Sequence, residues 1–108
     1  MKNILLMLPF LFAVISTQAK EKAEQLQFKV NGNCDMCKAR IEKAAKVNGV
    51  KSAEWNEQTH FIIVKFMPSK TNQTAIQQHI AAAGYDTEDV IESDDAYQAL
   101  PQCCQYTR

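Results

Sequence analysis

The sequence predicts an α+β fold of four antiparallel strands and two helices in the order β-α-β-β-α-β, followed by a C-terminal tail. Three observations predict it. Apolar and polar residues alternate with a period of two at 26–30, apolar residues recur at helical spacing at 35–47, and a second helical stripe ends at Gly84. Elements in this order form a ferredoxin-like sandwich, in which both helices cover one face of a four-stranded sheet.

The first half of the domain is expected to contain a strand at 26–30 and a helix at 35–47, joined by a short loop at 31–33. Gly49 ends the helix, because glycine readily adopts the left-handed conformation that often follows a helix. A second strand is expected at 50–56, where apolar residues again share one face.

The second half is expected to contain a strand at 60–67, rich in β-branched and aromatic residues, and a helix that Thr71 caps and Gly84 ends. A weaker fourth strand is expected at 85–92. In this topology the loops before the first helix and after the second helix lie at the same edge of the sheet. We therefore expect Tyr85 to lie beside the cysteines of the first loop.

The N-terminus has the pattern of an export signal. It contains Lys2, an apolar run from 4 to 15, and then Thr17-Gln18-Ala19, with small residues at the two positions that a signal peptidase reads. We expect cleavage after Ala19 and a periplasmic or secreted protein with no stable membrane insertion after cleavage. The alternative is an uncleaved N-terminal anchor, although the apolar run is shorter than the roughly 20 residues that span a bilayer.

The expected organisation is a signal peptide at 1–19, a short leader at 20–25, one small domain at 26–92 and a cysteine-containing tail at 93–108. Twelve basic residues balance twelve acidic ones, so the charge gives no reason to expect nucleic-acid binding. A bridge within a Cys-x-x-Cys pair closes too small a loop to staple a fold, so the fold must come from its core.

Cys34 and Cys37 lie where the first strand is followed by the first helix. A thiolate is a soft metal ligand and a nucleophile, and the free N–H groups of a helix N-terminus lower thiol pKa values. Two thiolates favour soft d¹⁰ ions: Cu(I) accepts two sulfurs, whereas Zn(II) prefers four ligands and would find half a site. Met36 is a candidate third soft ligand or an exposed side chain, and His60 and His79 are expected at the surface or its boundary.

Further segments accompany the two cysteines. They are Gly32-Asn33-Cys34-Asp35-Met36-Cys37, Gly49-Val50, Ala53, Trp55-Asn56, Phe66 and Ala83-Gly84-Tyr85-Asp86. Over about 26–91 the chain resembles the heavy-metal-associated domain, the fold of copper chaperones, of the periplasmic mercury-binding protein and of the N-terminal modules of copper-exporting ATPases. It departs from the family's common Gly-Met-Thr ahead of the first cysteine, where it has Asn31-Gly32-Asn33.

The resemblance implies that Cys34 and Cys37 bind one soft ion, most often Cu(I), and that Tyr85 packs near the site. Hg(II) and Zn(II) are the alternative ions. It implies a carrier or scavenger and not an enzyme, with a metal-transporting ATPase or another metal-transfer protein as partner. A mercury-binding transport component, with the same fold and ligands, is the first alternative.

Two other interpretations of the cysteine pair remain open. The order strand, Cys-x-x-Cys, helix also describes a thioredoxin-like redox site. Against this, no tryptophan precedes Cys34, and the elements after Pro68 do not follow the order of that fold. The pair could also be a local disulfide without a function, because disulfides form readily in exported proteins.

The tail carries Cys103 and Cys104, whose side chains should diverge because the residues are adjacent. If the fourth strand runs away from the cysteine edge, the tail starts at the far end of the sheet. Ten extended residues span at most roughly 33 Å, and a strand only about 17–20 Å, so the tail can cross the sheet and return. On the way it could cover Phe61 and Ile63. We hypothesise that one or both tail cysteines join Cys34 and Cys37, against the alternative of a separate disulfide or free thiols.

A short helix is expected in the tail between Asp94 and Leu100. The first helix of the domain carries four basic residues, namely Lys38, Arg40, Lys43 and Lys46, against Glu42. This face suits an acidic metal-transfer partner, but it is equally typical of a solvated amphipathic helix.

Overall fold

The computed structural model describes residues 21–91 and 94–108, so the expected signal peptide and its cleavage site lie outside the described residues. Within them no helix is long and apolar enough to cross a bilayer. The elements in chain order are β1 (Glu24–Lys29), α1 (Asp35–Ala45), β2 (Val50–Trp55), β3 (Phe61–Phe66), α2 (Gln73–Ala82), α3 (Asp94–Gln98) and a 3₁₀ helix (Gln102–Cys104).

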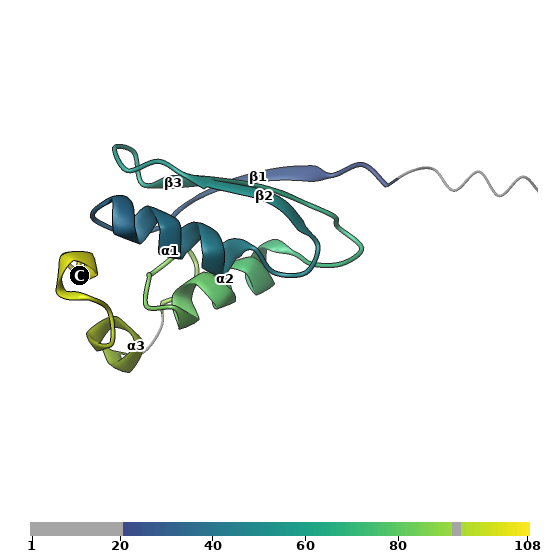
Figure 1. The fold of residues 1–108 in the computed structure, drawn as a ribbon. Coiled ribbons are helices and arrows are strands. Elements are labelled where there is room, and N and C mark those ends of the chain that lie inside the picture. Colours follow the sequence, from purple (N-terminus) through teal and green to yellow (C-terminus); the bar gives the residue numbers. More distant parts are fainter. Residues whose placement is uncertain (1–20, 92–93) are drawn as a thin grey trace, which may run out of the picture.

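The strands form an antiparallel sheet of order β1-β3-β2, and α1 and α2 cover one face of it (Figure 1). The central strand β3 turns its alternate residues Ile62, Val64 and Phe66 toward the helices, where they are buried. Phe28 and Trp55 complete that layer from β1 and β2. The predicted α+β sandwich with both helices on one face is therefore present, built on three strands in the described part of the chain.

The fourth strand predicted at 85–92 is reduced to a single antiparallel bridge between Val30 and Thr87. The cause is a side-chain network that turns the chain. The Thr87 hydroxyl donates to Gln77 Oε1 at 2.9 Å and accepts from the Val90 N–H at 3.1 Å, and the Asp89 N–H donates to the same Gln77 oxygen at 3.0 Å. These bonds satisfy the backbone of 89–90 locally, so it does not pair with β1.

The predicted helix boundaries need small corrections. The cap of α2 is Asn72 and not Thr71, because Asn72 Oδ1 accepts from the Ala75 N–H at 2.9 Å. Helix α1 ends at Ala45, two residues before the predicted end. Gly49 has a φ of +100° and lies in the left-handed region, as its predicted role requires.

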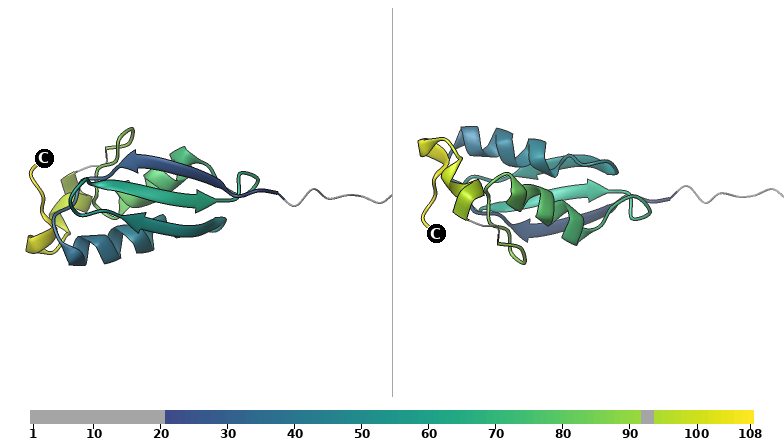
Figure 2. Two further views of the ribbon diagram at one scale, coloured as in Figure 1. Left: turned by 90° about the horizontal axis from the view of Figure 1, so that it is seen from above. Right: turned by 90° about the horizontal axis from the view of Figure 1, so that it is seen from below.

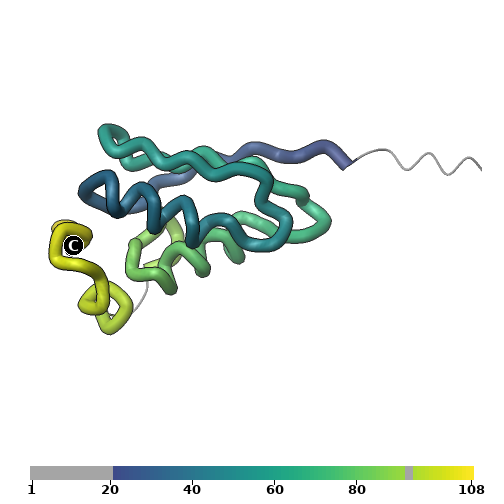
Figure 3. Tube along the Cα trace, viewed as in Figure 1, coloured from purple at the N-terminus to yellow at the C-terminus, as the bar shows by residue number. Residues whose placement is uncertain are grey.

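The prediction that the tail starts at the far end of the sheet is wrong. The turn at 87–90 ends the pairing with β1, so the chain does not continue to that end. Helix α3 and the 3₁₀ helix lie at the end of the domain where α1 begins (Figures 2 and 3). The tail therefore does not cover the open face of the sheet, where Ile63 remains 41% exposed. The predicted short tail helix is present as α3, ending at Gln98.

Candidate metal centre

Three cysteine sulfurs gather at the start of α1. The Sγ atoms of Cys34, Cys37 and Cys104 all lie within 4.8 Å of one another, and those of Cys34 and Cys37 are 3.6 Å apart. Cys37 and Cys104 are fully buried, whereas Cys34 is partly exposed. All four cysteines are free thiols. The cluster thus has an inner side closed by protein and an outer side at Cys34.

The two cysteines of the Cys-x-x-Cys motif have opposite acidities. Cys34 immediately precedes α1, and the backbone N–H of Cys37, together with that of Met36, favours its thiolate and lowers its pKa. Burial acts in the other direction on Cys37 and raises its pKa to about 11, with a further contribution from the Cys104 thiol. The predicted effect of the helix N-terminus therefore holds for Cys34 alone.

Tyr85 lies on the inner side of the cluster and is fully buried. Burial, followed by the neighbouring Cys104 and Cys37, raises the pKa of its phenol. Arg40 acts on the same hydroxyl in the opposite direction. Within the described residues no atom meets hydrogen-bond geometry for this hydroxyl, which makes it an unpaired buried polar group beside the sulfurs.

Cys103 and Met36 form a second, outer sulfur pair. The Cys103 thiol donates to Met36 Sδ at 3.6 Å, and both side chains are exposed. The side chain of Cys103 thus diverges from that of Cys104, as expected for adjacent residues. Its backbone faces the cluster instead, because the Cys103 carbonyl accepts from Cys34 Sγ at 3.6 Å and from Asn33 Nδ2 at 3.4 Å.

The histidines lie where the sequence predicted. His79 is exposed on α2, and His60 is partly buried, stacked on Trp55 with 5.5 Å between the ring centroids. Neither belongs to the cysteine cluster of the described residues, which consists of Cys34, Cys37 and Cys104.

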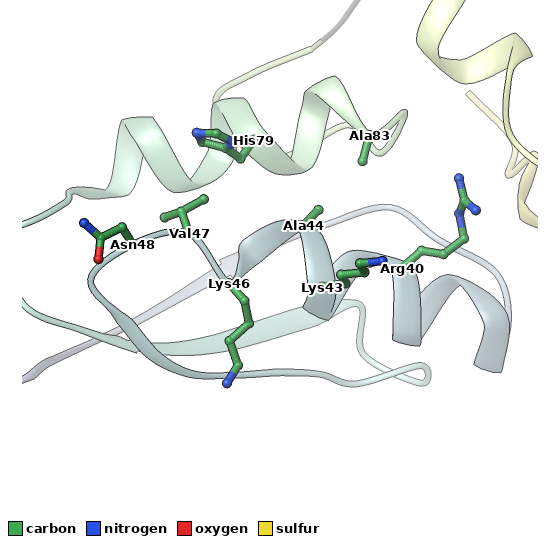
Figure 4. Close-up of a pocket in the computed structure, with 8 residues that line it drawn as sticks. All are labelled: Arg40, Lys43, Ala44, Lys46, Val47, Asn48, His79 and Ala83. Atoms are coloured by element: carbon green, nitrogen blue, oxygen red, sulfur yellow. The ribbon is translucent and has the colours of Figure 1, made fainter.

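The basic face of α1 divides into two parts. Lys38 has a structural contact, since its Nζ donates to Glu42 and, at 2.8 Å, to the Trp55 carbonyl. Arg40, Lys43 and Lys46 instead border an open groove of about 780 Å³ between α1 and α2 (Figure 4). In that view Arg40 extends toward the C-terminal segment.

Sequence reasoning missed Tyr106, which holds the tail on the domain. Its buried hydroxyl donates to the Gly84 carbonyl and accepts from the Asp86 N–H, each at 2.8 Å. Burial raises the pKa of this phenol to about 12, so it stays protonated at physiological pH. The sequence did contain a signal for this role. Tyr106 is an aromatic residue two positions after Cys104, on a tail that was predicted to be able to return to the cysteine edge.

The comparisons with known proteins identify relatives of the same fold. The family model for the heavy-metal-associated domain matches residues 27–86. The chain is 39% identical over 67 residues to a copper-exporting P-type ATPase of Staphylococcus epidermidis, and this match covers 60% of the chain but 8% of that ATPase.

Smaller relatives are covered almost completely. The copper chaperone CopZ of Staphylococcus epidermidis is 37% identical over 62 residues, which is 56% of this chain and 91% of that chaperone. The crystal structure of oxidised MerP from Ralstonia metallidurans CH34 superimposes with a TM-score of 0.58 at 28% identity, covering 61% of this chain and 94% of MerP. The chain belongs to the heavy-metal-associated domain family.

Proposed function

We propose that this protein is an exported carrier or scavenger of a soft heavy-metal ion, Cu(I), bound by the thiolates of Cys34 and Cys37. The observation that carries the proposal is the 3.6 Å separation of their sulfurs at the N-terminus of α1. In this proposal the protein binds and releases its ion without chemical conversion, so it is not an enzyme.

The sulfurs of Cys34 and Cys37 need to move only slightly to bind one ion together. With metal–sulfur bonds of about 2.3 Å, a linear two-sulfur ion holds its ligands about 4.6 Å apart. The Cys34 and Cys37 sulfurs, at 3.6 Å, must separate by about 1 Å, a change that rotation of one side chain provides. Cys34 is the partly exposed ligand, so it offers the path by which the ion enters and leaves.

Export and transfer complete the proposal. We infer cleavage after Ala19 and a periplasmic or secreted location from the N-terminal pattern. The partner is inferred to be a metal-transporting ATPase or another metal-transfer protein with an acidic surface. Arg40, Lys43 and Lys46 are suited to meet such a surface, because Arg40 and Lys43 lie on α1, Lys46 directly follows it, and the thiolates lie at its start.

The test is a competition titration of the reduced chain, residues 20–108, with Cu(I) against a coloured Cu(I) chelator. We expect one ion to bind tightly, binding to be lost in Cys34→Ser, and binding to be retained in the matched control Cys103→Ser, whose thiol faces Met36. Absence of Cu(I) binding together with rapid dithiol exchange against a disulfide substrate would favour a redox protein instead.

A parallel titration with Hg(II) addresses the mercury-binding alternative, which the structural similarity to MerP favours. Both ions are soft and thiophilic, so each should bind in isolation. The informative measurement is the ion that co-purifies with the exported protein from cells exposed to both. Mercury in place of copper would assign the protein to mercury transport.

A further inference from the structure

We propose that the C-terminal tail supplies a third thiolate, Cys104, so that the bound ion sits in a three-sulfur site. This inference rests on the proposed function, because it concerns how the same ion is held. It selects one of the two tail cysteines: Cys104 belongs to the inner cluster, and Cys103 does not.

The first support is distance. Three sulfurs bound to one ion in a trigonal plane, with bonds of about 2.3 Å, lie about 4.0 Å from one another. The sulfurs of Cys34, Cys37 and Cys104 all fall within 4.8 Å of one another, and those of Cys34 and Cys37 are 3.6 Å apart. Shifts of less than about 1 Å therefore convert the three free thiols into a trigonal ligand set.

The second support is burial. Cys104 is 0% exposed although it lies only four residues from the end of the chain. A thiol that is fully buried cannot bind an ion directly from solvent by itself. The Cys104 thiol also lies close enough to Cys37 to affect its pKa. The other two sulfurs lie within 4.8 Å of it, and the buried Tyr85 hydroxyl is on the same inner side of the cluster.

The third support is the anchoring of the tail, which fixes the position of Cys104. On one side of it, Leu100 is buried against Gly84, where an added Cβ would lie 2.8 Å from Leu100 Cγ. On the other side, Tyr106 stacks on Tyr85 with 6.2 Å between the ring centroids.

Arg108 adds a second set of contacts that anchor the tail. Arg108 forms a two-bond ion pair with Asp86, with Nε and Nη2 donating at 2.8 and 2.9 Å, and Nη1 donates to Asp94 at 2.6 Å. Asp86 follows Tyr85 in the chain. The ion pair of Arg108 and the ring stack of Tyr106 therefore hold the tail to the same short segment. Paired two-bond contacts of this kind are geometrically specific.

A three-sulfur site would change how the ion is delivered. A partner thiolate can approach from the Cys34 side, while Cys37 and Cys104 remain buried. The ion then moves by stepwise exchange: each incoming thiol loses its proton as its sulfur binds the ion, and the thiolate that it displaces takes up a proton and leaves as a thiol. The tail thus holds the ion more tightly without closing the outer side of the site.

The deciding measurement is the sulfur coordination number of the Cu(I)-loaded chain 20–108, obtained by X-ray absorption spectroscopy. We expect three sulfurs in the wild type and in Cys103→Ser, and two in Cys104→Ser. We also expect Cys104→Ser to bind Cu(I) more weakly by on the order of tenfold, which corresponds to ~1.4 kcal/mol.

The outcomes separate the two proposals. Tight wild-type binding with two sulfurs, and the same affinity in Cys104→Ser, would overturn the role of Cys104 and leave the Cys34–Cys37 carrier intact. No binding by the wild type would overturn both. The wild-type coordination number needs no variant, so poor folding of Cys104→Ser would not obscure the answer.

Discussion

The hydroxyl of Tyr106 should contribute more to stability than its position two residues from the end of the chain suggests. Tyr106→Phe keeps the ring contacts with Tyr85 and Tyr97 but removes the bonds to the Gly84 carbonyl and the Asp86 N–H. Both bonds are buried, and each backbone group left unpaired costs ~1–3 kcal/mol. We expect the unfolding free energy to fall by roughly 2–4 kcal/mol. The two costs do not add in full, because the tail can relax and let water bind the unpaired backbone groups.

Urea denaturation followed by the fluorescence of Trp55, the only tryptophan of the chain, measures this loss. Hydrogen exchange at residues 100–106 shows whether the tail opens before the domain unfolds. The exposed Thr107→Ala is the matched control and should stay within about 0.5 kcal/mol of the wild type. An unfolding free energy for Tyr106→Phe equal to that of this control would refute the reasoning.

Three further predictions concern the cysteines and the tail. In the metal-free protein at neutral pH, iodoacetamide should modify Cys34 before Cys37, because the pKa of Cys34 is lowered and that of Cys37 is raised; peptide mass mapping that finds Cys37 first would contradict this. Fold stability should fall between pH 9 and about 11, because the Cys37 thiol ionises at lower pH when unfolded than when folded; Cys37→Ser should show a smaller fall in urea titrations at each pH. Gly84→Ala should destabilise the domain by ~2–4 kcal/mol in the same denaturation assay, since its φ is +107° and the new Cβ would lie 2.7 Å from the Ala96 carbonyl oxygen; a smaller loss than for Ala83→Gly would argue against a fixed tail.

Hydrophobic periodicity was sufficient to predict the main elements of the domain. The alternation in β1 and β3 and the stripes in α1 and α2 reflect burial against one core, which is a local property of the sequence. The fourth strand could not be predicted in the same way. It is cut short because Gln77, ten residues earlier in the chain, binds Thr87 and Asp89, and such a contact leaves no periodic signal.

The site was predictable in part for a similar reason. The motif at Cys34 and Cys37, and the topology that brings Tyr85 to the same edge, are visible in the sequence. The choice of Cys104 over Cys103 depends on the 3₁₀ helix and on the contacts of Tyr106, which only the folded chain defines. The raised pKa of Cys37 likewise depends on its burial in the folded chain.

The early end of the fourth strand also affects the risk of self-association. In the part of the chain that the structure describes, the outer edge of β1 is paired only near Lys29 and Val30. An unpaired strand edge is a template for adding the strand of another molecule, which is how many aggregates begin. Here the exposed residues along that strand are polar or charged, with Glu24 at one end and Lys29 at the other. These side chains disfavour edge-to-edge stacking, so the incomplete sheet carries little risk of adding the strand of another molecule.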